Sequence, residues 1–91
     1  MKKIDSVCTL TLGTSVQTVR VSGLACIVQN NSDYASVYMK ERRADGEDVT
    51  AENGWRIAPG ESTPIPFTAL DLSLAASAAG TDVRVLLLDE L

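Results

Sequence analysis

The thiols are the first side chains to examine for chemistry, because the sequence contains no histidine and only two cysteines, Cys8 and Cys26. Without histidine, neither a Ser-His nor a Cys-His nucleophile pair can form, and the commonest general base near neutral pH is missing. Two thiolates alone cannot complete a four-ligand zinc site. We therefore expect both cysteines to be small buried residues with free thiols. A disulfide between neighbouring strands is the alternative.

Carboxylates gather between Glu41 and Gly54, at Asp45, Glu47, Asp48 and Glu52. They lack the Asp-x-Asp-x-Asp-Gly spacing that places oxygen ligands around one calcium ion. No apolar residues surround them to raise a carboxyl pKa for glycoside hydrolysis. We expect a solvated hairpin or loop here. The sequence predicts no catalytic residue, no metal and no cofactor, and hence a protein that is not an enzyme.

The four aromatic residues are the candidates for an interaction surface: Trp55, Tyr34, Tyr38 and Phe67. Trp and Tyr combine a flat apolar body with a polar group, which suits sugar stacking or a protein interface. Structural roles are the alternative, with Trp55 capping one end of the fold, Tyr38 pairing across strands and Tyr34 lying in a turn.

The segment Trp55 to Phe67 holds the only Trp, the only Phe and all three prolines. Pro59 and Gly60 are typical of the two central positions of a type II turn, so we expect strand, turn and strand. Pro64 and Pro66 lack an amide hydrogen and cannot lie in a central ladder. The second strand should therefore lie at a sheet edge, with its apolar side chains turned inward.

Most of the remaining chain shows the alternation of β-strands. Ser6–Leu12 directs Cys8, Leu10 and Leu12 to one face. For Ser15–Val21 the buried face is ambiguous, and we expect a break at Ser22-Gly23. Leu24–Gln29 is apolar enough to be a central strand covered on both sides. The turn formers Asn30 to Asp33 should join it to Ala35–Glu41 in a hairpin.

Two segments near the C-terminus complete the pattern. In Thr68–Ala79, Leu70, Leu72 and Leu74 favour a strand, whereas the alanines and Gly80 would also suit a helix; we prefer an extended segment over Leu72–Ser77. Val83–Leu88 is apolar on both faces, so it must be central or have one face covered by another subunit. About seven short strands predict one all-β domain over residues 1–91, an antiparallel β-sandwich of jelly-roll or immunoglobulin-like type.

Charge and hydropathy limit the partners. The net charge is −4, and the eight Lys and Arg residues are scattered except at Lys40–Arg43. Nucleic acid is not an expected partner, because its binding requires clustered cations.

No stretch approaches the ~18 apolar residues of a membrane span. Lys2 and Lys3 resemble the start of a signal peptide, but Asp5 and Ser6 interrupt any apolar region, so we expect synthesis in the cytoplasm without a cleaved signal.

Three stretches carry a resemblance to a known group of proteins. They are Leu24 to Glu41, Ala-Pro-Gly-Glu-Ser from Ala58, and Leu-Ser-Leu-Ala-Ala-Ser-Ala-Ala-Gly-Thr-Asp-Val-Arg-Val-Leu from Leu72. Together they resemble small bacteriophage or prophage virion proteins, such as head-decoration, head-fibre and tail-associated β modules. The resemblance implies a structural subunit located in the virion, which assembles with copies of itself and with other virion proteins. A small carbohydrate- or ligand-binding module is the alternative function.

Overall fold

The computed structural model describes residues 2–21, 25–42, 47–65 and 71–90, with side chains described between residues 7 and 87 of those ranges. Within them the chain forms eight strands and no helix. The strands are β1 (Lys2–Leu12), β2 (Gln17–Arg20), β3 (Ala25–Asn30), β4 (Val37–Arg42), β5 (Trp55–Ile57), β6 (Ser62–Pro64), β7 (Asp71–Ala76) and β8 (Thr81–Glu90).

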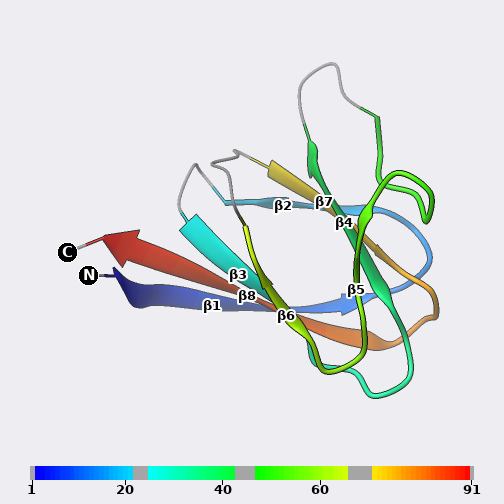
Figure 1. The fold of residues 1–91 in the computed structure, drawn as a ribbon, viewed down its shortest axis with the longest axis horizontal. Helices are drawn as coiled ribbons and strands as arrows, with labels where there is room; N and C mark the ends of the chain where they lie inside the picture. Colours follow the sequence, from blue (N-terminus) through cyan, green and yellow to red (C-terminus); the bar gives the residue numbers. More distant parts are fainter. Residues whose placement is uncertain (1, 22–24, 43–46, 66–70, 91) are drawn as a thin grey trace.

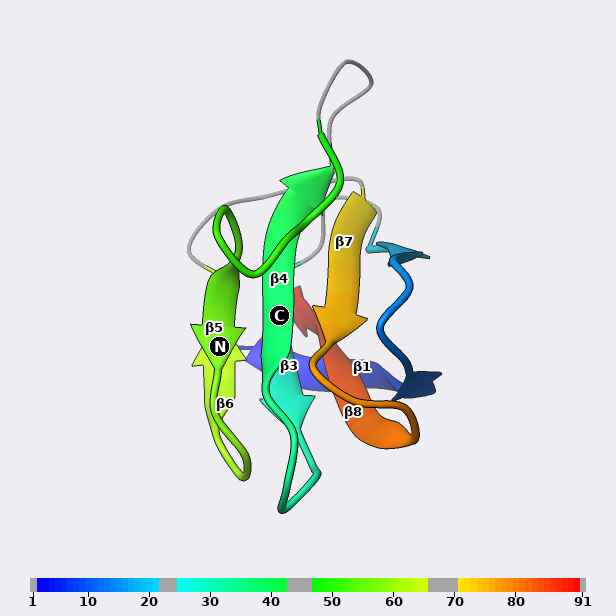
Figure 2. The same cartoon turned by 90° about the vertical axis from the view of Figure 1, so that its right-hand side faces the viewer.

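Two antiparallel sheets of four strands pack face to face (Figures 1 and 2). Sheet A has the order β1-β8-β3-β6, and sheet B has the order β2-β7-β4-β5. The first strand pairs with the last, the second with the seventh, the third with the sixth and the fourth with the fifth. This is the order of a jelly roll, in which one long hairpin is rolled into a sandwich. The all-β sandwich expected from the sequence is confirmed, and of the two topologies considered the jelly roll is the one observed.

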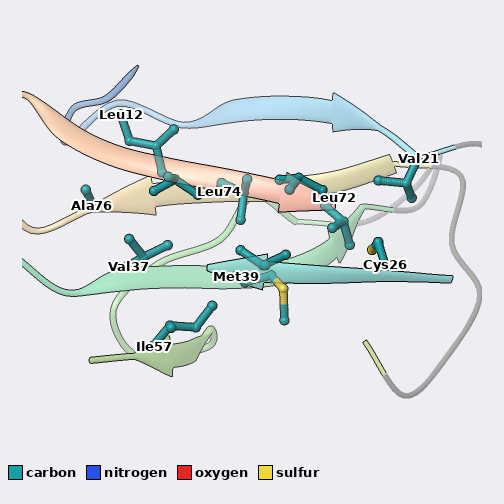
Figure 3. Packing of buried hydrophobic residues seen from close by; sticks show 12 residues of the cluster. Leu12, Val21, Cys26, Val37, Met39, Ile57, Leu72, Leu74 and Ala76 are labelled. Carbon is teal, nitrogen blue, oxygen red and sulfur yellow. The ribbon is translucent and has the colours of Figure 1, made fainter. Parts of the chain in front are cut away.

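The core lies between the sheets, where the labelled side chains in Figure 3 meet. Alternation explains its composition: Leu12 is fully buried and Cys8 and Leu10 pack against the cluster, whereas Val7, Thr9 and Thr11 face outward. The predicted inward face of β1 is therefore confirmed. In β2, where the pattern was ambiguous, Val19 and the following Val21 turn inward.

The Pro59-Gly60 turn forms as expected. Gly60 has φ +79°, and the amide of Glu61 donates to the carbonyl of Ala58 across the turn at 3.0 Å. The flanking strands do not pair with each other, because β5 belongs to sheet B and β6 to sheet A. β6 lies at the edge of its sheet, as the prolines predicted, and Ile65 packs against the core.

The hairpin predicted around Asn30 to Asp33 is wrong, because β3 lies in sheet A and β4 in sheet B. Asn30 explains the crossing. Its fully buried side-chain amide donates to the carbonyl of Ala35 at 2.7 Å and to that of Ile57, in sheet B, at 3.0 Å. Its Oδ1 accepts the amide of Ser32 at 3.1 Å. The polar turn therefore ties the two sheets together instead of reversing the chain within one sheet.

The C-terminal third follows the extended interpretation. β7 is a strand, so the helical alternative is wrong; Leu72, Leu74 and Ala76 turn inward in alternation. β8 is central, between β1 and β3, as its apolar sequence predicted. β3 is also central, but its outward side chains, including Ile27, are only half-buried, so the expectation that both its faces are covered is wrong. The predictions at Ser22-Gly23, Pro66, Phe67 and Leu70 lie outside the described residues.

Replacing Asn30 should destabilise the protein strongly. In Asn30→Ala the buried carbonyls of Ile57 and Ala35 each lose the hydrogen bond donated by the Asn30 side chain. This predicts a loss of about 2–4 kcal/mol in the free energy of unfolding. The matched control is Asn31→Ala, whose amide bonds Asp82 on the surface and whose loss should cost less than about 1 kcal/mol. Urea unfolding measures both variants, and equal losses would contradict the role assigned to Asn30.

Candidate functional site

Trp55 begins the edge strand β5 and is 64% exposed. Its register partner is Met39, a core residue, so Trp55 stands on the inward side of sheet B but at its rim. The sequence left a rim position and a binding surface open for this residue. The rim position is what the structure shows, with most of the indole accessible.

The two tyrosines lie elsewhere. Tyr34 is 59% exposed in the β3–β4 connection, and its hydroxyl donates to the carbonyl of Ala79 in the β7–β8 turn at 2.7 Å. Tyr38 stands on the outward side of β4, with Arg56 and Ala75 as its register partners. Tyr38 and Trp55 are thus on opposite sides of sheet B, and Phe67 is outside the described residues. The aromatic residues that are described do not form one stacking platform.

Both cysteines are free. Cys26 is buried, as the sequence predicted, whereas Cys8 is only half-buried, so the prediction of burial is wrong for Cys8. β8 separates β1 from β3, so the Cα atoms of Cys8 and Cys26 are at least two strand spacings apart, about 9.5 Å. This exceeds the ~7 Å limit between the Cα atoms of a disulfide. Cys26 is buried in the core, and burial raises the pKa of its thiol. Neither the alternative disulfide nor a reactive thiolate at Cys26 fits this arrangement.

The outward side of sheet B is partly covered by the chain itself. Residues 47–54 fold back over it, and Val49 is only 3% exposed. Its backbone amide donates to the hydroxyl oxygen of Ser73 at 3.0 Å. A Cβ on Gly54 would lie 2.5 Å from Val49 and 3.2 Å from Tyr38, so this close packing requires glycine. The acidic segment is therefore not simply a solvated loop, because Val49 anchors it to the sheet.

The outward side of sheet A carries an apolar row. No described segment folds over this row in the way that residues 47–54 fold over sheet B. Backbone register aligns one residue from each strand, and we call this set the sheet A row: Val7, Leu86, Ile27 and Pro64. Val7 is 52% exposed, Pro64 is exposed, and Leu86 and Ile27 are half-buried. The row crosses the whole sheet, about 14 Å at the usual strand spacing.

Charge is distributed unequally between the two outer faces. Next to the sheet A row lies Arg84, whose guanidinium contacts Asp82 at 3.4 Å, and Asn31 also donates to that carboxylate. On sheet B the outward positions hold basic residues that pair with carboxylates, as Arg20 does with Asp71 at 2.7 Å and Arg42 with Asp48. The described part of sheet A's outer face therefore carries one apolar row among polar residues and is close to neutral.

Among the described residues, no group of three or more Cys, Asp or Glu side chains is arranged to hold a metal ion. Within the same ranges, no helix has the length and hydrophobicity to cross a membrane.

Sequence reasoning missed the sheet A row because its four members come from distant segments. Each strand's outward residues can be read from alternation, but their alignment depends on strand order and register. The excess of apolar residues on both faces of Val83–Leu88 was the one local signal.

Comparison with known proteins finds no matching family model, no significantly similar curated protein and no significantly similar solved structure. A functional interpretation therefore rests on the geometry of the chain itself.

The two thiols should differ in reactivity. In the folded protein a thiol-specific reagent should modify the half-buried Cys8 first, while Cys26 should react at a rate limited by unfolding, because it is buried and its raised pKa lowers the thiolate fraction at pH 8. Mass spectrometry of the modified peptides over time measures both rates. Equal rates in buffer, or a disulfide-linked peptide pair, would contradict the placement of Cys26.

Proposed function

We propose that this protein is a non-enzymatic structural subunit that acts by associating with copies of itself. The observation that carries the proposal is the sheet A row, an apolar strip across all four strands of an outer face. Exposed apolar patches of this kind mark interaction surfaces more often than isolated exposed residues do.

The contrast between the two outer faces supports this proposal. Sheet B has part of its outer face covered by Val49 and its neighbours, and its exposed positions hold paired charges. Sheet A has the apolar row beside a neutral Arg84–Asp82 pair. Copies that carry a net charge of −4 repel one another, so they approach with least opposition through a neutral face.

The jelly roll itself is compatible with more than one role, because this architecture serves in viral capsids and in lectins. We further propose a place in a phage or prophage virion, alongside other virion proteins. That part of the proposal is supported by the sequence resemblance described above, which spans β3, nearly all of β4 and β7, and the first part of β8.

Carbohydrate binding is the second candidate function, and the exposed indole of Trp55 favours it. A sugar stacked on that ring would shift the emission of the only tryptophan in the chain. Against it stands the separation of Trp55 from Tyr34 and Tyr38, which leaves one described aromatic ring at that place.

Solution mass tests the proposed self-association. Light scattering coupled to size exclusion, across about 5 to 200 µM, should show a species larger than the 9.7 kDa monomer. Leu86→Lys places a charge in the middle of the sheet A row and should shift the mass towards the monomer.

Thr18→Lys is the matched control, because Thr18 is exposed on sheet B and its replacement should leave the mass unchanged. A wild-type protein that stays monomeric throughout the series would contradict the proposed function.

A further inference from the structure

The four outer edges of the sandwich are not equivalent. Three edge strands are short and carry residues that discourage pairing: β2 has four residues and ends at Arg20, β5 has three with Arg56 in the middle, and β6 has three and ends at Pro64. β1 has eleven residues, and Ser6–Leu12 within it has neither charge nor proline. Proteins usually protect edges with shortness, charge, proline or bulges. The first residues of β1 carry charges and a register shift between Ile4 and Ser6, so the unprotected stretch is Ser6–Leu12.

The hydrogen-bond pattern shows which groups face this edge. The amide of Asn31 donates to the carbonyl of Asp82 at 2.9 Å, so Asp82 directs its backbone groups towards β3 and not towards its β1 partner Thr11. Hydrogen-bonded and non-hydrogen-bonded pairs alternate along an antiparallel ladder. Cys8, Leu10 and Leu12 therefore bond β8, whereas Val7, Thr9 and Thr11 direct their N–H and C=O groups to the free edge.

One side-chain hydrogen bond agrees with this assignment. The side chain of Gln17 donates to the carbonyl of Thr11 at 3.0 Å, so that oxygen does face away from β8. Since a carbonyl oxygen has two lone pairs, it can still accept a second hydrogen bond.

We propose that the free edge of β1 is the contact between two copies of this chain, with β1 pairing antiparallel to β1 of the second copy across a two-fold axis at Thr9. This inference rests on the proposed self-association and adds to the sheet A row a second contact, at the edge of the same sheet. The two copies of sheet A then form one continuous sheet of eight strands.

Self-complementarity argues for a second copy as the occupant. With the axis at Thr9, each Val7 lies opposite Thr11 of the other copy, so all three residues that face the edge find partners that also face it. Thr9 meets Thr9, and threonine pairs of this kind are favourable across strands.

Charge also fits this register. Lys2, Lys3 and Asp5 lie beyond the point where β1 of the other copy has ended at Leu12, so the strands bring no like charges opposite each other. A register centred elsewhere leaves some of Val7, Thr9 and Thr11 without partners. The edge contact is separate from the sheet A row, which lies on the face of the sheet and stays available for a further contact.

Disulfide trapping tests the register directly. Hydrogen-bonded partners have Cα atoms about 5.5 Å apart, within the range of a disulfide. In a Cys8→Ala, Cys26→Ala background, Thr9→Cys should give a covalent dimer under mild oxidation, whereas Thr18→Cys, an exposed threonine on the edge strand β2, should give little. Equal cross-linking at both positions would overturn the inference.

Thr9→Lys supplies a second test that leaves the intrachain ladder intact, because the backbone of Thr9 faces away from β8. Two lysines at the axis should weaken the dimer by about tenfold or more, while Thr18→Lys leaves it unchanged. Circular dichroism checks that each variant is folded.

The outcomes separate this inference from the proposed function. If the wild type associates and Thr9→Lys associates equally well, the β1 contact is wrong and self-association stands. If the wild type is monomeric and the Thr9→Cys variant gives no cross-link, the β1 contact and the proposed self-association are both wrong. The same holds if a strand of another protein, and not a second copy, pairs with β1.

Discussion

The buried amide of Asn30 is the interaction on which the arrangement of the two sheets depends. This side chain leaves the end of β3 in sheet A and bonds backbone carbonyls of the β3–β4 connection and of β5. Its own backbone bonds Glu61 and Gly60, next to β6. One residue thereby fixes where the chain passes from one sheet to the other and where it returns. In a dry interior each of these carbonyls would be costly to leave unpaired, so the crossing has one well-defined geometry.

Rolling a long hairpin into this form has a consequence for its ends. The first strand pairs with the last, which places β8 inside sheet A and leaves β1 at its edge. Figure 1 shows the start of β1 next to the end of β8. The other edges end in short strands with Arg or Pro, so a partner strand has one long and uncharged place to pair. The same topology aligns Val7, Leu86, Ile27 and Pro64 across the outer face. Both features belong to sheet A, and this is why an assembly role fits the chain better than a ligand site at the separated aromatic residues.

Local pattern predicted most of the strands and little of their arrangement. Alternation in β1 and β4, the Pro59-Gly60 turn and the apolar run in β8 each depend on residues within a few positions, and the structure bears them out. The hairpin at Asn30 was wrong because turn propensity says that a chain changes direction, not which sheet it enters; here a buried amide and three long-range bonds decided it. Burial of Val49 was missed because it depends on Ser73 and Gly54. Predicting the sheet A row would have required the register of four strands that are distant in the chain, and a single sequence does not contain that register in any local pattern. The aromatic residues were visible in the sequence, but their separation was not.

Amide hydrogen exchange at single-residue resolution, followed as protein concentration rises, tests the assembly of β1 edges most directly. The amides of Cys8 and Leu10 bond β8 within one chain, so their protection should not depend on concentration. The amides of Val7 and Thr9 face the free edge, and they should exchange quickly in dilute solution and become protected as copies pair. Fast exchange of Thr9 at every concentration, beside a protected Leu10, would contradict the account.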